Sequence, residues 1–178
     1  SVVLLEELEL GNGDSVVISM SGSFPGANIA MLSACQVLGV TPIVLSSVGS
    51  SSWGANRENF TWIDMEEFLY KNGLINTKSV AVSIGGMGDI GDNISDVGIE
   101  IIEEIIFKSG TILINEKNLS KSIDKKISLL GDINKFDAFI NIGGSTSSLG
   151  EGIGKNYMRG GIISPISKDD IDEIYFNV

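Results

Sequence analysis

The sequence predicts an α/β fold in which a doubly wound, mostly parallel sheet of about five strands lies between helices. Short apolar segments alternate along the chain with segments of helical periodicity. The apolar segments show no alternation of polar and apolar residues, which is typical of strands covered by helices on both faces. A strand, a loop, a helix and a second strand also follow one another within about 33 residues, which suits a crossover between parallel strands.

The N-terminal elements follow this pattern in order. Residues 1–10 have helical periodicity, and the predicted helix stops at Gly11. The first strand is predicted at Val16–Met20, the next helix over residues 29–40 and the second strand at Pro42–Ser46. Together these elements form the first βαβ unit of the sheet.

The middle of the chain repeats the pattern after an irregular segment. Gly49–Thr61 has neither helical nor strand periodicity, and a helix is predicted to start at Thr61 or Asp64. The third strand is predicted at Ser79–Ile84, followed by a glycine-rich loop and a helix over about Ser95–Lys108. The units are similar in architecture but have no fixed period, which argues against a solenoid.

The last elements complete the sheet. Strands predicted at Thr111–Asn115 and Asp137–Ile142 flank an amphipathic helix over residues 119–130. The chain is long enough for one domain of this kind and too short for two. Residues 1–178 are therefore predicted to form a single three-layer, Rossmann-like domain.

The composition excludes several classes of function. Asp and Glu number 23 against 12 Lys and Arg, and a net charge of −11 is unsuited to sequence-independent binding of nucleic acid or anionic lipid. Histidine is absent, which removes Ser-His-Asp triads and histidine zinc sites. The one cysteine, Cys35, lies in an apolar helical segment and is predicted to be a core residue.

The chain has no apolar run of about 18 residues and no signal-peptide pattern. It begins at Ser1 without an initiator methionine, so we expect it to be part of a longer protein. Any membrane attachment is then expected to come from a segment outside this sequence.

Four predicted loops lie at the carboxyl edge of the sheet, where open parallel sheets bind ligands because helix N-termini present free N–H groups there. All four are rich in Gly, Ser or Asn, and small hydroxyls with bare amides suit a phosphate or a carboxylate. None contains a nucleotide-binding motif, and any one of them alone can be explained as a turn. The loops are Ser21–Asn28, Ser47–Asn56, Gly85–Asn93 and Gly143–Gly150.

The first and last loops supply polar candidates for ligand binding. Ser21 and Ser23 can donate hydroxyl groups to an anion, and Ser145 is a candidate in the last loop. Asn28 can bind a ligand or cap the following helix, and capping is the favoured interpretation. No lysine falls in the four loops, so a serine nucleophile there would have to rely on a carboxylate, and covalent catalysis is disfavoured.

The irregular segment offers side chains of a different kind. Arg57 can hold a carboxylate through two hydrogen bonds, and Trp53 can form one wall of a site. The alternative for Arg57 is a surface ion pair with a neighbour such as Glu58.

Three carboxylates at the same edge are candidates for a cation site or for catalysis. Asp89 and Asp92 lie in GGMGDIGDN, and their oxygens suit Mg²⁺ or Ca²⁺, although the spacing is not that of an EF-hand. Turn formation and helix capping explain both aspartates more simply. Glu116 directly follows a predicted strand and can bind an amine, act as a base or face solvent.

Four separated blocks, SGSFPGANIA, SSVGSSSWGANRENFTWIDME, VSIGGMGDIG and FINIGGSTSSLG, together resemble the family called poly-gamma-glutamate system proteins. The resemblance covers most of the chain and implies a role in making or exporting poly-γ-glutamate, a capsule polymer, at the cell envelope. Members of the family generally carry a hydrophobic N-terminal segment, so this chain looks like a C-terminal portion. From the matching blocks, the resemblance implies these site residues: Ser21, Ser23, Trp53, Asn56, Arg57, Gly85, Gly86, Asp89, Gly143 and Gly144.

Three functions remain open from the sequence. The favoured one is a non-catalytic accessory protein that binds a γ-glutamyl chain or another biosynthetic component through the Gly/Ser loops, by a local or cation-bridged contact because an acidic chain repels a polyanion. The second is a hydrolase or transferase acting on γ-glutamyl or phosphorylated substrates, with Asp89 and Glu116 as catalytic residues and Mg²⁺ held by Asp89 and Asp92. The third is an assembly scaffold whose glycine loops are only turns.

Overall fold

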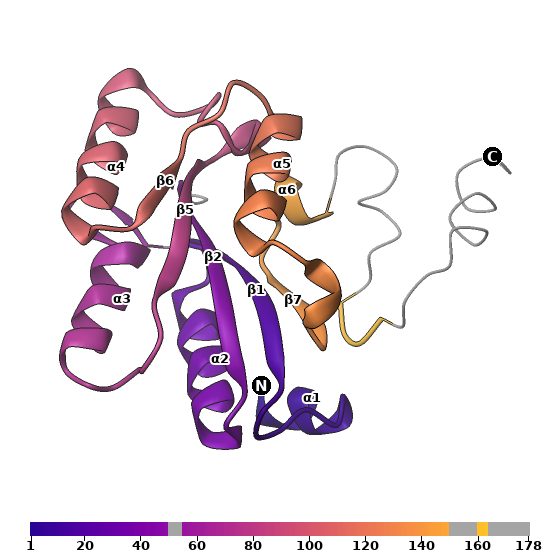
Figure 1. Ribbon diagram of the computed structural model, residues 1–178. Helices are drawn as coiled ribbons and strands as arrows, with labels where there is room; N and C mark the ends of the chain where they lie inside the picture. Colours follow the sequence, from indigo (N-terminus) through magenta and orange to yellow (C-terminus); the bar gives the residue numbers. More distant parts are fainter. Residues whose placement is uncertain (50–54, 150–159, 164–178) are drawn as a thin grey trace, which may run out of the picture.

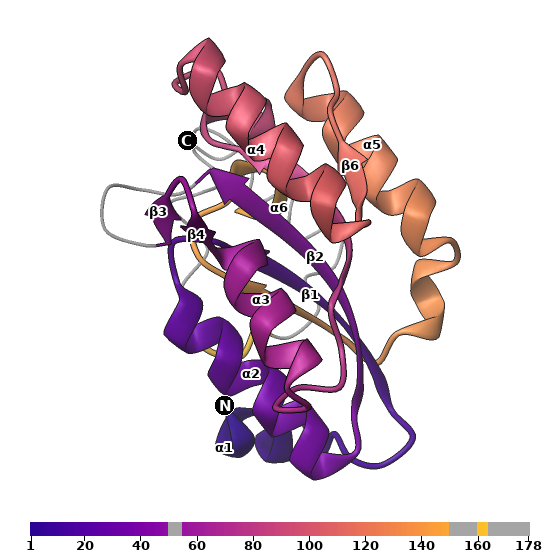
Figure 2. The same ribbon diagram turned by 90° about the vertical axis from the view of Figure 1, so that its left-hand side faces the viewer.

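The computed structural model describes residues 1–49, 55–149 and 160–163, and it shows the predicted fold: a five-stranded, all-parallel sheet flanked by helices in a three-layer, Rossmann-like arrangement (Figure 1, Figure 2). The order of the strands across the sheet is β6-β5-β2-β1-β7. All five expected strands are confirmed, and β2 extends beyond its predicted end. The strands are β1 (Ser15–Ser21), β2 (Thr41–Gly49), β5 (Ser79–Gly85), β6 (Ile112–Ile114) and β7 (Ala138–Ile142).

The helices divide between the two faces of the sheet. Helices α2, α3 and α4 cover one face, α5 and α6 lie on the other, and the short α1 packs against α2 (Figure 1). From β1 the chain moves stepwise through β2 and β5 to β6, and α5 then returns over the opposite face toward β7. The bounds are α1 (Val2–Glu7), α2 (Pro25–Leu38), α3 (Trp62–Lys71), α4 (Asp96–Ser109), α5 (Leu119–Leu130) and α6 (Thr146–Leu149), with 3₁₀ turns η1 (Met87–Asp89) and η2 (Ile133–Lys135).

Two helices begin at the capping residues that the sequence indicates. The Thr61 backbone N–H donates to Asp64 Oδ2 at 2.7 Å, so both residues proposed for the start of α3 take part in it. At the start of α4, Ser95 Oγ accepts a hydrogen bond from the Gly98 N–H at 3.2 Å. The predicted starts of α3 and α4 are therefore confirmed.

Helix α2 begins earlier than predicted, at Pro25 instead of residue 29. Proline suits the first helical position because its φ is fixed near the helical value and its missing N–H would be unpaired there anyway. The Asn28 backbone N–H consequently donates to the Phe24 carbonyl at 3.0 Å, within the helix. The interpretation of Asn28 as a helix cap is therefore wrong.

The segment expected to lack periodicity contains a short antiparallel hairpin. Its strands are β3 (Asn56–Arg57) and β4 (Phe60–Thr61). Strands of two residues each are too short to leave an alternating pattern in the sequence. The hairpin leads directly into α3.

The hydrophobic core is unequal on the two sides of the sheet. The larger part lies between the sheet and α2, α3 and α4, with strand residues such as Ile18 and Val82 fully buried. A smaller cluster of Leu45, Ala81 and Ile114 lies under α5. Toward the carboxyl ends of the strands the α5 and α6 side becomes polar, and this is where the candidate site lies.

Candidate functional site

The order of the strands reverses between β1 and β7, because β2 pairs with one side of β1 and β7 with the other. Open parallel sheets bind ligands beyond the carboxyl ends of the strands at such a switch point. The loops that follow these two strands touch: a Cβ on Gly143 would lie 2.7 Å from Ser21 Cβ and 3.2 Å from Phe24 Cδ2. Gly143, with a φ of 110°, therefore lets the β7 loop close against the β1 loop.

Polar side chains gather where these loops meet. Ser19 of β1 is in register with Asn141 of β7, and Ser19 Oγ lies 2.6 Å from Oγ of Ser148 in α6. The Asn141 side-chain nitrogen donates to the Gly143 carbonyl at 2.8 Å. We call this group the switch-point cluster, and it consists of Ser19, Ser21, Asn141, Gly143, Ser145, Thr146 and Ser148.

Two atoms of the switch-point cluster, Asn141 Oδ1 and Thr146 Oγ1, are buried and have no hydrogen-bond partner among the residues that the structure describes. The Asn141 amide cannot be turned round, because its oxygen would then face the Gly143 carbonyl. Buried polar atoms are nearly always paired, so such atoms mark positions that a ligand can satisfy. Asn28 Oδ1 is a third atom of this kind, and Asn28 Nδ2 donates to the Ser21 carbonyl at 3.0 Å.

The loop after β1 also brings the N-terminus of α2 to this edge. The N-cap residue Phe24 makes no side-chain hydrogen bond to the helix, and the first turn contains no acidic residue. The positive end of the helix dipole is thus left for another negative group. Ser21 is buried beside it, and its Oγ accepts a hydrogen bond from the backbone N–H of the half-buried Ser23 at 3.2 Å.

A second polar group surrounds Asp89 in η1. Asp89 is only 3% exposed and has a φ of 63°, a left-handed conformation that is rare outside glycine. Ser83 Oγ donates to its Oδ1 at 2.7 Å, and Ser122 Oγ and Lys126 Nζ both donate to its Oδ2 at 2.5 Å. We call Ser83, Asp89, Ser122 and Lys126 the Asp89 cluster; in it a buried carboxylate is paired with a buried lysine.

Lys126 connects the two clusters. Its Nζ also donates to Ser147 Oγ at 2.7 Å, and Ser147 Oγ lies 2.7 Å from Ser145 Oγ. Helix α5, which carries Lys126, lies beside α6 (Figure 1). The positive charge of a buried lysine thus reaches the β7 loop through two hydroxyl groups.

The two predicted glycines of the β5 loop, Gly85 and Gly86, lie close to the backbone of Gly49. A Cβ on Gly85 would lie 2.9 Å from the backbone N and O of Gly49, and Gly85 has a φ of 80°. The Gly86 N–H donates to the Gly49 carbonyl at 3.4 Å. Both glycines therefore shape the loop that holds Asp89, and they lie outside the switch-point cluster. Gly144, by contrast, is exposed in the β7 loop, between Gly143 and Ser145.

The structure does not bring the three predicted carboxylates together. Asp92 is exposed and Glu116 is half-buried in the connection from β6 to α5, and no hydrogen bond within the described ranges joins either of them to Asp89. No group of three or more His, Cys, Asp or Glu residues placed to hold a metal ion occurs among the described residues. A metal ion at Asp89 would have to displace Lys126 from Oδ2.

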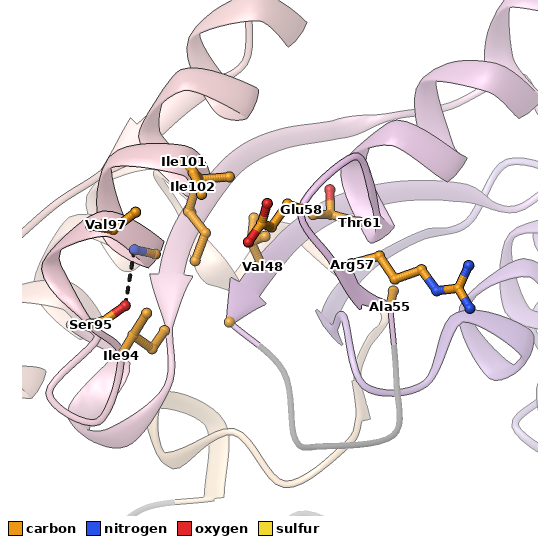
Figure 3. Close-up of a pocket in the computed structure, with 12 residues that line it drawn as sticks. Val48, Ala55, Arg57, Glu58, Thr61, Ile94, Ser95, Val97, Ile101 and Ile102 are labelled. Atoms are coloured by element: carbon orange, nitrogen blue, oxygen red, sulfur yellow. Dashed lines mark hydrogen bonds between the residues drawn. The ribbon is translucent and has the colours of Figure 1, made fainter.

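A hollow at the same sheet edge lies between the β3–β4 hairpin and α4 (Figure 3). Its volume is about 240 Å³, and its hydroxyl-bearing residues Ser95 and Thr61 are already engaged at the starts of α4 and α3. Arg57 is exposed at its margin and points away from the aliphatic lining, and it forms no ion pair with Glu58 (Figure 3). The aliphatic lining residues are Val48, Ile94, Val97, Ile101 and Ile102.

Two further candidates belong to this segment. Trp53 lies outside the described residues. Asn56 contributes its backbone to β3. Among the predicted site residues that the structure describes, the hollow therefore gathers only Arg57, and its aliphatic lining is unsuited to an anion.

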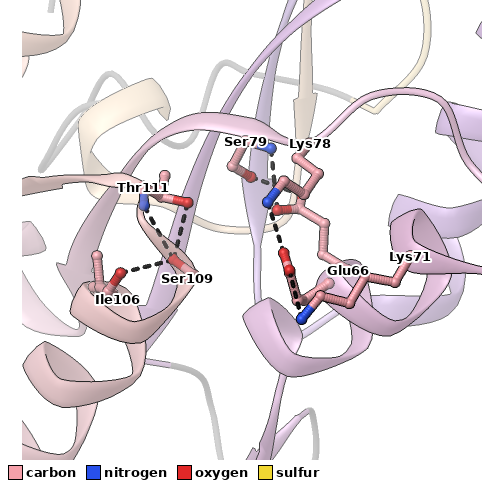
Figure 4. A network of polar contacts seen from close by, with 8 residues as sticks. Glu66, Lys71, Lys78, Ser79, Ile106, Ser109 and Thr111 are labelled. Atoms are coloured by element: carbon pink, nitrogen blue, oxygen red, sulfur yellow. Dashed lines mark hydrogen bonds and ion pairs between the residues drawn. The ribbon is translucent and has the colours of Figure 1, made fainter.

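A separate polar network lies in the core under α3 (Figure 4). Glu66 accepts hydrogen bonds from Ser79 Oγ at 2.8 Å and from the Ser79 backbone N–H at 3.0 Å. Ser79 Oγ lies 2.6 Å from Ser46 Oγ, which accepts from Trp62 Nε1 at 3.2 Å. Burial raises the pKa of Glu66 to about 7, while the hydrogen bonds from Ser79 oppose the rise.

Sequence reasoning missed Lys126 and Ser122, which lie on α5 outside the four loops. The signal was present in the inward stripe of that helix. Leu119, Ile123 and Leu130 recur at helical spacing on the partly buried face, and Ser122 and Lys126 interrupt the same stripe. A lysine at a core-facing position needs a buried partner, and Asp89 is that partner.

Comparisons with family models, with curated proteins and with solved structures find no match to this chain. Within the described part of the chain, none of the helices has the length and apolar character needed to span a membrane.

Proposed function

We propose that this chain is a non-catalytic binding protein whose switch-point cluster holds a carboxylate-bearing ligand. The observation that carries the proposal is the pair of buried, unpartnered atoms at the junction of the β1 and β7 loops, Asn141 Oδ1 and Thr146 Oγ1 in the described part of the chain. Donors for an anion belong to the same two loops, because the β7 loop carries the Ser145 hydroxyl and the β1 loop leads into the N-terminus of α2.

The chemistry of these groups favours a ligand that carries both an anion and an N–H group. An anion accepts hydrogen bonds from hydroxyls and from the helix N-terminus, whereas the side-chain oxygen of Asn141 can only accept. A γ-glutamyl unit meets both requirements, because its α-carbon bears a carboxylate and an amide N–H. The four sequence blocks that resemble poly-gamma-glutamate system proteins support the same choice, and with it an accessory role in poly-γ-glutamate synthesis or export at the cell envelope.

The arrangement supports binding better than the two alternatives. A metal-assisted enzyme needs a free carboxylate, but both side-chain oxygens of Asp89 accept hydrogen bonds, from Ser83, Ser122 and the cation of Lys126. A scaffold with glycine loops used only as turns does not account for unpartnered polar atoms at the switch point.

The proposal is tested by isothermal titration calorimetry with γ-glutamylglutamate. Saturable binding is expected, and Thr146→Val, which keeps the shape of the side chain and removes the hydroxyl, should weaken it by roughly three- to tenfold, the value of one neutral hydrogen bond. Thr111→Val is the matched control, because the Thr111 hydroxyl lies 2.9 Å from Ser109 Oγ, outside the switch-point cluster, and the affinity should not change. A folded protein that shows no saturable binding would instead point to the scaffold.

A further inference from the structure

We infer that Lys126 supplies the positive charge of this carboxylate site, and that its ion pair with Asp89 makes the site select a singly charged carboxylate over a doubly charged phosphate or phosphonate. The inference rests on the proposed function, and it adds the source of the charge and the class of anion. It draws on two contacts of one buried lysine, the first with Asp89 and the second with Ser147.

Lys126 is positioned as an internal charge and not as a surface one. The side chain of Lys126 is 11% exposed and that of Asp89 is 1% exposed. A buried ion pair of this kind costs desolvation on both partners, so its presence beside a loop at the ligand edge of the sheet needs a reason. The contact with Ser147 supplies one, because it directs part of the lysine charge toward the switch-point cluster.

The hydroxyl groups pass this charge on in a fixed direction. Ser147 Oγ accepts from Lys126, so the hydrogen of Ser147 points away from the cation, and Ser145 Oγ lies 2.7 Å away. Either hydroxyl of this serine pair can be the donor, and we assign the donor role to Ser147. The half-buried Ser145 is then left to donate its own hydrogen toward a ligand. Hydrogen bonds in such a chain polarise one another, so Ser145 becomes a stronger donor than an isolated serine.

The balance of charge decides which anion is favoured. The Asp89 cluster contains one cation and one carboxylate, so its net charge is zero, and the chain as a whole carries −11. A single negative charge can be held by hydrogen bonds from Ser145 and α2, whereas a second one would meet no further positive charge within either cluster. The site therefore favours a carboxylate.

The same atoms do not support a serine nucleophile. A relay from Ser145 through Ser147 to a lysine base requires a neutral lysine that can accept a proton. Lys126 is instead a donor to both Asp89 and Ser147. Hydrogen bonds therefore run outward from the lysine, which suits anion recognition and opposes proton abstraction.

The first experiment compares N-acetylglycine with its phosphonate counterpart, N-acetylaminomethylphosphonate, at a pH where the phosphonate is doubly charged. The parent protein should bind the carboxylate at least tenfold more tightly. Asp89→Asn leaves Lys126 unbalanced and should remove or reverse this preference, and Asn tolerates the left-handed conformation of position 89. Asp92→Asn is the matched control, because Asp92 is an exposed carboxylate of the same loop, and the preference should not change.

The second experiment removes the pair as a unit. Asp89→Asn/Lys126→Met leaves no buried charge unpaired and should weaken N-acetylglycine binding at least tenfold, whereas Lys125→Met, one residue away on the exposed side of α5, should not. Circular dichroism establishes that each variant is folded.

The outcomes separate the inference from the proposed function. If the parent binds γ-glutamylglutamate but the double variant binds N-acetylglycine as well as the parent does, or if the parent prefers the phosphonate, the inference is overturned and the proposed function stands. If the parent binds none of the probes, both are overturned. Covalent labelling of Ser145 by a fluorophosphonate, located by mass spectrometry, would also overturn the inference, because it would show a nucleophile.

Discussion

Two buried carboxylates in the described part of the chain, Glu66 and Asp89, are held at opposite ends of the same strand. Glu66 contacts Ser79, the first residue of β5, and Asp89 follows the last residue of that strand in η1. Serine hydroxyls donate to both. Only Asp89 also receives a hydrogen bond from a lysine, because the neighbour of Glu66, Lys78, donates to Glu67 instead.

The difference shows how position along the sheet decides what a buried carboxylate does. At the amino end of β5, a register shift near Val44 accompanies a Ser79 that points toward α3, and the carboxyl group of Glu66 closes a network inside the core. Burial raises the pKa of Glu66 to about 7. At the carboxyl end, Asp89 is paired with Lys126 and lies beside the loops that open parallel sheets use for ligands.

The largest expected effect is a loss of stability when the ion pair between Asp89 and Lys126 is broken. Lys126→Met leaves the carboxylate of Asp89 buried without its cation, and the free energy of unfolding should fall by about 3–5 kcal/mol. Denaturant unfolding followed by circular dichroism measures the change. The exposed Lys125→Met should stay within about 0.5 kcal/mol of the parent. A Lys126→Met protein as stable as the parent would mean that Asp89 does not depend on the ion pair.

The next largest effect is the dependence of stability on pH that Glu66 produces. Its pKa is higher in the folded state, about 7, than the ordinary value of 4.5, so the folded protein holds this proton more tightly and loses stability as the pH rises from 4.5 to 7. Glu66→Gln cannot ionise and should gain up to about 3 kcal/mol relative to the parent above pH 7, with little gain below pH 4.5. Unfolding measured across this range gives the difference, and a constant offset between the two proteins would contradict the assignment.

The smallest effect is a difference in stability between two threonine variants, one at the proposed site and one in a hydrogen bond that stabilises the fold. Thr146→Val removes a buried hydroxyl that has no partner in the described part of the chain, so without ligand it should stabilise the protein by about 1 kcal/mol. Thr111→Val removes a hydroxyl that Ser109 contacts, and should destabilise it by a similar amount. Thermal unfolding of both variants tests the sign, and destabilisation by Thr146→Val would place that hydroxyl in the structural group.

The fold could be predicted because its signals are local. The apolar runs of β1, β2, β5, β6 and β7 and the amphipathic α5 each mark one element, and the rule for parallel sheets then places the loops at one edge. That rule also selected Ser21 and Gly143, which meet at the switch point, and Ser145 in the same β7 loop as Gly143. The start of α2 was misplaced because Pro25 acts within the helix and not before it.

The charge of the candidate site could not be predicted because it depends on contacts between distant segments. A lysine on an amphipathic helix is usually solvated. No sequence pattern near Lys126 indicates that it pairs with Asp89. Only the return of α5 over the sheet face brings the two together. Arg57, selected for its chemistry, is instead exposed at the margin of the neighbouring hollow, and its side chain points away from the aliphatic lining (Figure 3).

The return of the chain from β6 to β7 also sets the order in which this protein can become functional. Ser19 and Ser148 are separated by 129 residues, and Asp89 and Lys126 by 37. Contacts between residues far apart in the sequence form slowly, because closing a long loop costs conformational entropy. A chain whose last strand has not docked holds the β1 loop without its partner, so a ligand would recognise and stabilise only the completed fold.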